Sequence, residues 1–260
     1  MKETEKKEST GSQASANSLA SSRRGLLRGL AAGGLVAGAG LSLGAGPATA
    51  ASRRIARQSA SWTPPNSPSQ AEQELFVHGN DRWKMQAQLH PREYADTRTP
   101  LVAAQHPWAM IVSCIDSRVP PELIFDQGLG DLFVSRTAGQ VLDGAVLGST
   151  AYAATKSYVK LIVVLGHQGC GAVQSAIERK DNPGTPNFPP RLEFLTDRIK
   201  DAIPPAGTPN RENLAINENI RRIRNQLLQE PQISPRVAAG TLNVIGARYE
   251  LDTWIAHKIN

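Results

Sequence analysis

The chain has 260 residues, of which 40% are hydrophobic and 20% are charged, and it contains two cysteines. This composition is typical of a soluble globular protein, and two cysteines are too few for a disulfide framework. The net charge of +6 comes from 29 basic and 23 acidic residues.

The first 50 residues resemble an export signal of the twin-arginine type. The segment Ser22-Arg-Arg-Gly-Leu-Leu-Arg28 carries the arginine pair, and no charged residue occurs from Gly29 to Ser52. This stretch is long enough to span a bilayer, but its seven glycines and eight alanines favour a removable signal over a membrane anchor. An Ala-x-Ala site ending at Ala50 predicts cleavage there. A disordered basic tail is the alternative interpretation.

Removal of residues 1–50 would take away six basic and three acidic residues and lower the net charge from +6 to +3. We therefore expect a periplasmic or extracellular protein with no membrane attachment after signal removal and no nucleic-acid partner. The twin-arginine machinery carries folded proteins, so both thiols could bind a metal before they meet an oxidising compartment.

Residues 51–70 are rich in proline and predict a linker, and residues 71–260 predict one domain. Apolar periodicity predicts helices over residues 71–89, 144–159, 170–179, 191–202 and 212–229. Continuous apolar runs predict strands at residues 109–114, 132–135, 161–166 and 242–246. Loops are predicted at 182–190 and 204–209, and after residue 231 only the last strand is clear. The alternation predicts an α/β fold with a central, mainly parallel β-sheet flanked by helices.

Both cysteines and one histidine lie at the end of a predicted strand or just after it. Cys114 ends the strand at 109–114, and His167 and Cys170 follow the strand at 161–166. Functional groups gather at the carboxyl ends of parallel strands, so these side chains can converge. Three such ligands suit zinc and leave a fourth position for water, which indicates a catalytic site. Each of these residues alone would more often be an ordinary part of the core. A redox pair is not predicted, because the two cysteines do not form a Cys-x-x-Cys motif.

Asp116 and Arg118 lie two and four residues beyond Cys114. The guanidinium can hold the carboxylate through two parallel hydrogen bonds, which would keep Asp116 off the metal and leave it free to accept a hydrogen bond. Two thiolates cancel the charge of Zn²⁺, so the metal should acidify its water less than an all-histidine site does. We therefore expect activity to rise toward alkaline pH.

Cys-x-Asp-x-Arg at Cys114–Arg118 and Gly-His-x-x-Cys-Gly at Gly166–Gly171 resemble the motifs of the β-class carbonic anhydrases. The resemblance covers about residues 70 to 255. It implies a catalytic domain over residues 71–260 that reversibly hydrates carbon dioxide to bicarbonate and a proton. It also implies one Zn²⁺ per subunit, held by Cys114, His167 and Cys170, with Asp116 and Arg118 as the catalytic dyad.

The resemblance further implies a substrate pocket and an oligomer. The pocket residues that carry over are Gln105, Phe133, Ala138, Tyr152 and Gly171. In the family, part of this pocket comes from a neighbouring subunit, so we expect a homodimer or a higher homo-oligomer.

Several positions depart from the family pattern. Ile115 and Gln168 replace the usual serines, and Gln140 ends a segment that usually ends in asparagine. Ile111 stands where a bicarbonate-inhibited subgroup carries tryptophan, which argues against that regulatory site. Two further functions stay open: hydrolysis of carbonyl sulfide or carbon disulfide at the same site, and a catalytically silent module that binds zinc or bicarbonate.

Overall fold

The computed structural model describes residues 62–184 and 189–259. The predicted export signal, its cleavage site and most of the predicted linker lie outside these residues. Within the described part, five strands form one sheet in the order β2-β1-β3-β4-β5. The strands are β1 (Ala109–Cys114), β2 (Leu132–Thr137), β3 (Leu161–His167), β4 (Asn243–Tyr249) and β5 (Ala256–Ile259).

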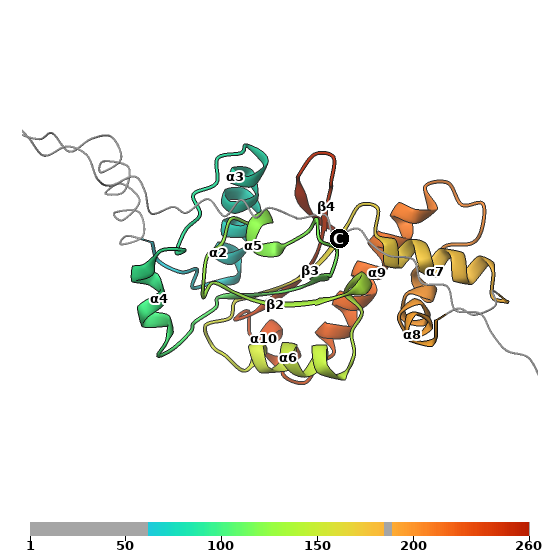
Figure 1. Ribbon diagram of the computed structural model, residues 1–260. Coiled ribbons are helices and arrows are strands. Elements are labelled where there is room, and N and C mark those ends of the chain that lie inside the picture. Colours follow the sequence, from blue (N-terminus) through green and yellow to red (C-terminus); the bar gives the residue numbers. More distant parts are fainter. Residues whose placement is uncertain (1–61, 185–188, 260) are drawn as a thin grey trace, which may run out of the picture. The chain divides into compact units, whose positions relative to one another are not determined.

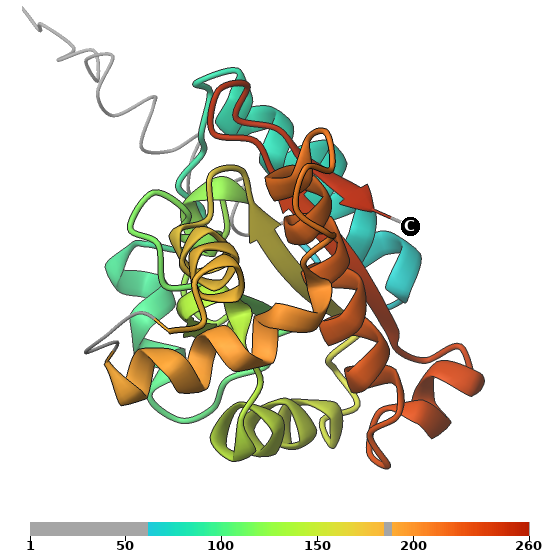
Figure 2. The same ribbon diagram turned by 90° about the vertical axis from the view of Figure 1, so that its right-hand side faces the viewer.

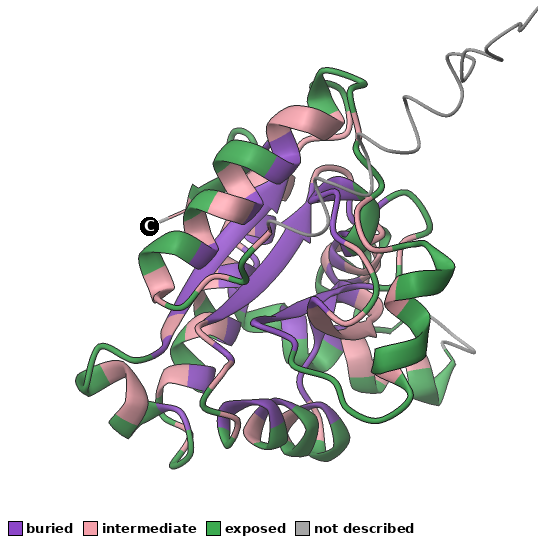
Figure 3. Cartoon of the chain, turned by 90° about the vertical axis from the view of Figure 1, so that its left-hand side faces the viewer, coloured by how far each residue is buried: buried purple, intermediate pink, exposed green. Residues whose placement is uncertain are grey.

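The first four strands are parallel, and β5 pairs antiparallel with β4. Every residue of β1 and β3 is buried, as their continuous apolar sequences predict for strands covered on both faces. Figure 3 shows these central strands enclosed by helices whose outer faces are exposed. The prediction of a mainly parallel α/β sheet is therefore confirmed.

Helices cover both faces of the sheet. In Figure 1, α6 and α10 lie below the strands, and α2 and α3 lie above them. Figure 2 shows α9 running along the sheet, where it contacts β3 and β4. The α-helices between β3 and β4, together with α6 before β3, are α6 (Gly144–Ala154), α7 (Gly171–Asp181), α8 (Pro190–Ile199), α9 (Arg211–Leu228) and α10 (Ser234–Ala238). Short helices are α4 (Ala95–Leu101), α5 (Pro121–Ile124), η2 (Ala138–Gln140) and η3 (Lys200–Ala202).

The helical segment before β1 differs from the single helix predicted over residues 71–89. It consists of α2 (Pro68–Glu72), a π-helical stretch η1 (Gln73–Gly79) and α3 (Asn80–Lys84). It begins inside the predicted linker because the Ser67 side chain accepts a hydrogen bond from the Gln70 amide and Pro68 occupies the first turn. The local change of period in η1 cannot be seen in a simple apolar pattern.

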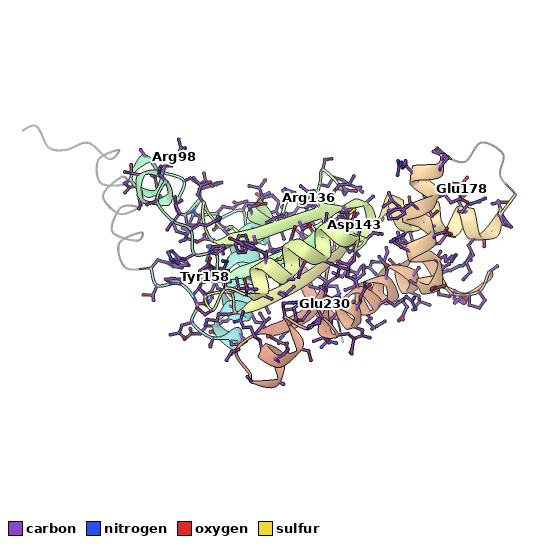
Figure 4. The ribbon with its side chains drawn as sticks, turned by 90° about the horizontal axis from the view of Figure 1, so that it is seen from below. Arg98, Arg136, Asp143, Tyr158, Glu178 and Glu230 are labelled. Carbon is purple, nitrogen blue, oxygen red and sulfur yellow. The ribbon has the colours of Figure 1, made fainter. Side chains whose placement is uncertain are left out.

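Helix α6 begins where the sequence predicts, at Gly144. Asp143 caps it by accepting hydrogen bonds from the amides of Ala145 and Val146 at 2.9 Å. Figure 4 shows Asp143 at the start of this helix and Arg136 on the preceding strand. The helix ends at Ala154, five residues before its predicted end.

No helix in the described part of the chain is both long and apolar enough to cross a membrane.

Candidate metal centre

Three metal-binding side chains meet at one edge of the sheet. Cys114 is the last residue of β1, His167 is the last residue of β3, and Cys170 precedes α7. Because β1 and β3 are parallel neighbours, their carboxyl ends lie side by side. The two Sγ atoms are 4.0 Å apart, and the three ligand atoms all lie within 4.8 Å of one another.

The spacing of these atoms fits a zinc ion. Two sulfurs bound to tetrahedral zinc at 2.3 Å would be about 3.8 Å apart, close to the 4.0 Å between Cys114 and Cys170. His167 Nε2 is buried and has no hydrogen-bond partner among the described residues. The other ring nitrogen, Nδ1, lies 2.9 Å from the carbonyl oxygen of Gln168. Since a carbonyl only accepts, Nδ1 carries the proton and Nε2 keeps a free lone pair for a metal.

The two thiols strongly affect each other's protonation. A hydrogen bond from Cys170 lowers the pKa of Cys114 to about 4, although burial opposes this shift. The same contact raises the pKa of Cys170, and burial raises it further. The amide of Gly139 also donates to Cys114 Sγ at 3.4 Å. A divalent cation at this position would displace the remaining thiol proton and stabilise both thiolates.

Arg118 holds Asp116 through the bidentate contact that the sequence predicts. Arg118 Nε donates to Asp116 Oδ1 at 2.9 Å, and Nη2 donates to Oδ2 at 2.7 Å. The Arg118 amide adds a third bond to Oδ1 at 2.9 Å. These bonds hold the pKa of Asp116 at about 2, so the carboxylate is ionised at any neutral or alkaline pH. Its Oδ2 lies 3.9 Å from His167 Nε2, at the border of the metal site.

Arg136 supports the loop that carries Asp116. Its Nε donates to the carbonyl of Cys114 at 2.8 Å, and its Nη2 donates to the carbonyl of Asp116. The sequence analysis did not predict this supporting contact of Arg136. The place of Arg136 in β2 could have indicated this contact, but only if the pairing of β2 with β1 were already known.

The predicted pocket residues fall into three places. Ala138 begins η2 immediately before Gly139, and Gly171 begins α7 immediately after Cys170, so both adjoin the metal ligands. Phe133 and Tyr152 instead line a separate cavity of about 540 Å³ between β2 and α6, with ring centroids 6.0 Å apart.

Gln105 does not join the metal ligands within one chain. It is exposed and precedes β1, whereas Cys114 ends that strand. The strand alone spans about 17 Å at 3.3 Å per residue. Phe133 lies near the same far end, since it pairs with Met110 rather than with Cys114. In a single chain, Gln105 and Phe133 are therefore remote from the three ligand atoms.

The mainly parallel sheet and the Cys114–His167–Cys170 cluster define an α/β protein with a zinc-binding site. A family model described as carbonic anhydrase matches residues 109–254. Carbonic anhydrase 2 of Mycobacterium tuberculosis is 39% identical over 194 residues, covering 72% of this chain and 91% of that protein. The carbonic anhydrase of Mycolicibacterium smegmatis is 37% identical over 196 residues, with the same two coverages.

A solved structure of the β-carbonic anhydrase CcaA is 25% identical, with a TM-score of 0.57. The match covers 64% of this chain and 86% of that one. The chain belongs to the β-class of the carbonic anhydrase family.

Proposed function

We propose that this protein catalyses the reversible hydration of carbon dioxide to bicarbonate and a proton. The observation that carries the proposal is the cluster of Cys114, His167 and Cys170 ligand atoms within 4.8 Å, bordered by a carboxylate that Arg118 holds in place. When bound, zinc supplies an acidified water that can act as a nucleophile, and its two thiolate ligands should shift activity toward alkaline pH.

Asp116 and Arg118 border the three ligand atoms and would orient the water that attacks the substrate. Asp116 is ionised and has its two oxygens directed to Arg118, so it can accept a hydrogen bond from a nucleophilic water without itself becoming a ligand. This arrangement argues against a silent module in which Asp116 closes the metal site. Ala138, which begins η2 next to Gly139, is the small apolar residue that we propose to border the substrate.

The test is a stopped-flow assay of carbon dioxide hydration by the zinc-loaded protein at mildly alkaline pH. We expect rapid hydration, and a rate equal to that of buffer would reject the proposal. The same preparation assayed with carbonyl sulfide would distinguish the sulfur-containing substrates. Replacing Cys170→Ser should lower zinc content and activity together, and full activity without zinc would refute the ligand assignment.

The working unit that we propose is a homodimer or a larger assembly. Strand β2 is at the edge of the sheet, and the cavity beside it is lined by Phe133 and Tyr152. A second subunit placed against this edge could take Phe133, Tyr152 and Gln105 into its own active site. This would explain why these three pocket residues lie far from the metal ligands of their own chain.

We also propose that residues 1–50 form a twin-arginine signal and that the mature protein is periplasmic or extracellular. The support is the motif at Ser22–Arg28, the uncharged segment after it and the Ala-x-Ala site at Ala48–Ala50. Export in the folded state would also suit two thiols that lie 4.0 Å apart, because an unfolded chain could oxidise before binding zinc.

Replacing both Arg23→Lys and Arg24→Lys should stop export. If export continued unchanged, and a block of the general secretion route stopped it instead, this route would be wrong.

A further inference from the structure

Gln168 follows the metal ligand His167 and holds the turn between β4 and β5. Its Oε1 accepts hydrogen bonds from the amides of Leu251 at 2.9 Å and Asp252 at 3.3 Å. Its Nε2 donates to Asp252 Oδ2 at 3.2 Å. One side chain therefore makes three bonds to a turn more than 80 residues away in the sequence.

The backbone of Gln168 is also held by hydrogen bonds. Its amide donates to the carbonyl of Tyr249 at 2.9 Å, which continues the pairing of β3 with β4. Its carbonyl accepts the hydrogen bond from His167 Nδ1 at 2.9 Å. The direction of this carbonyl fixes both the tautomer of the imidazole and the orientation of the ring.

The turn that Gln168 grips is anchored on its other side by Asn80, which is buried. Asn80 Oδ1 accepts from the amide of Ala256 at 2.8 Å, and Nδ2 donates to the carbonyl of Trp254 at 3.1 Å. A further bond joins Nδ2 to the carbonyl of Ile124 at 3.2 Å. Gln168 is therefore fastened to a part of the molecule that is itself held from two sides.

We propose that the Gln168 side chain is a positioning device for His167. By fastening the peptide after His167 to the β4–β5 turn, it keeps the Gln168 carbonyl aimed at Nδ1 and Nε2 aimed at the metal. The inference rests on the zinc site of the proposed function but concerns metal retention, not the reaction. Loss of a group that orients a metal-binding histidine costs about 10- to 100-fold in metal affinity.

The first experiment replaces Gln168→Ala in the full-length holoenzyme. Zinc affinity is measured by competition with a chromophoric chelator, and ligand geometry is measured by the absorption spectrum of the cobalt-substituted protein. We expect affinity to fall by about 10-fold or more and the cobalt bands to shift. Gln174→Ala is the matched control, because Gln174 is an exposed glutamine of α7 whose Nε2 donates to Glu212 Oε1 at 3.2 Å.

An exchange of hydrogen-bonding groups tests the side-chain contact itself. Gln168→Glu keeps an acceptor for the two amides but sets a carboxylate against Asp252, so it should weaken zinc retention. Adding Asp252→Asn to that variant restores a donor opposite the carboxylate and should recover most of the affinity. Asp252→Asn alone should change little, because its amide oxygen can still accept from Gln168.

Unchanged affinity and spectrum in Gln168→Ala would overturn the inference. If that variant did not fold, a double variant no better than Gln168→Glu alone would overturn it equally. Failure of the proposed function gives a different result: the wild-type protein would bind zinc tightly but would not hydrate carbon dioxide, whatever the effect of Gln168.

Discussion

Arg118 fixes the conformation of the Asp116 carboxylate. The side chain of Arg118 is largely exposed, so the ion pair itself contributes little to stability, but its two parallel bonds fix the direction of both carboxylate oxygens. Since Asp116 Oδ2 is only 3.9 Å from His167 Nε2, a small rotation would bring it among the ligand atoms. We therefore expect this ion pair to matter for the orientation of the Asp116 carboxylate more than for the stability of the fold.

Replacing Arg118→Ala should lower carbon dioxide hydration by about 10- to 100-fold, more at pH 7 than at pH 9. The freed carboxylate would compete with hydroxide for the open position, and hydroxide becomes more abundant as pH rises. Protonation cannot cause the effect, because Asp116 has a pKa of about 2 in the wild type and an unperturbed aspartate titrates near pH 3.9. Stopped-flow rates across this pH range provide the check.

Arg118→Lys is the matched variant, since it keeps the charge but cannot form the two parallel bonds. Its activity should lie between those of the wild type and Arg118→Ala. An alanine variant with the wild-type rate and the same pH dependence would contradict this role for Arg118.

At the scale of elements, α9 packs on the sheet over two glycines. A Cβ atom at Gly166 would lie 2.5 Å from Ile220 Cδ1, and one at Gly246 would lie 2.9 Å from Ile220 Cγ2. Ile220 is completely buried between these positions. The close approach of α9 to β3 and β4 therefore depends on glycine in both strands, and Gly166 is also the residue before His167.

Gly166→Ala should lower the free energy of unfolding by about 1 to 3 kcal/mol, because the new methyl group collides with Ile220. The same change should cost clearly less in an Ile220→Ala background, where the colliding atoms are absent. Denaturant unfolding of the two single variants and the double variant measures this coupling. An equal cost in both backgrounds would show that the collision is not the cause.

Arg236 of α10 joins three separate segments through backbone carbonyls. Its Nη1 donates to the carbonyls of Ala154 at 2.8 Å and Lys156 at 2.9 Å, and its Nη2 donates to those of Val159 at 2.7 Å and Thr241 at 3.1 Å. One guanidinium thus holds helix α10 to the connection between α6 and β3 and to the residue Thr241 ahead of β4.

Arg236→Ala should reduce the free energy of unfolding by about 2 to 4 kcal/mol, since several carbonyls would lose a charged donor. Arg222→Ala is the control, because Arg222 makes an exposed ion pair with Asp201 at 3.1 Å and should cost no more than about 1 kcal/mol. Chemical denaturation of both variants gives the comparison. Equal losses would mean that the carbonyl contacts of Arg236 contribute no more than a surface ion pair.

The bounds of single elements could be predicted where burial is uniform. The apolar run at Ala109–Cys114 gives the bounds of β1 correctly, because a strand buried on both faces has an unbroken apolar sequence. The short strand β5 and helix α10 could not be predicted in this way. Strand β5 contains exposed polar residues, and its pairing with β4 and its bond from Ala256 to Asn80 come from distant parts of the chain.

The positions of the predicted pocket residues in the fold predict catalysis across a subunit boundary. Gln105→Ala removes a pocket residue but leaves the zinc ligands intact, and His167→Ala removes a ligand but leaves Gln105 intact. If Gln105 serves the partner's site, a mixed dimer of the two variants contains one complete site. Co-expression with different affinity tags would isolate that mixed dimer.

The mixed dimer should show carbon dioxide hydration well above that of either variant alone, approaching half the wild-type activity per dimer. Sedimentation velocity would verify the assembly in each preparation. A mixed dimer no more active than the two parent variants would place Gln105 outside the partner's site.

The Cys114–His167–Cys170 cluster and the Asp116–Arg118 ion pair could be predicted from local sequence, because these residues lie at or just beyond the ends of strands that apolar runs define. Cys114, Asp116 and Arg118 lie within five residues, and their mutual geometry follows from one strand and one turn. The hydrogen bonds of Gln168 to the β4–β5 turn, and the distance of Gln105 and Phe133 from the three ligand atoms, could not be predicted from local sequence. Those relations join residues far apart in the chain, and their distances depend on sheet order and register, which no local pattern encodes.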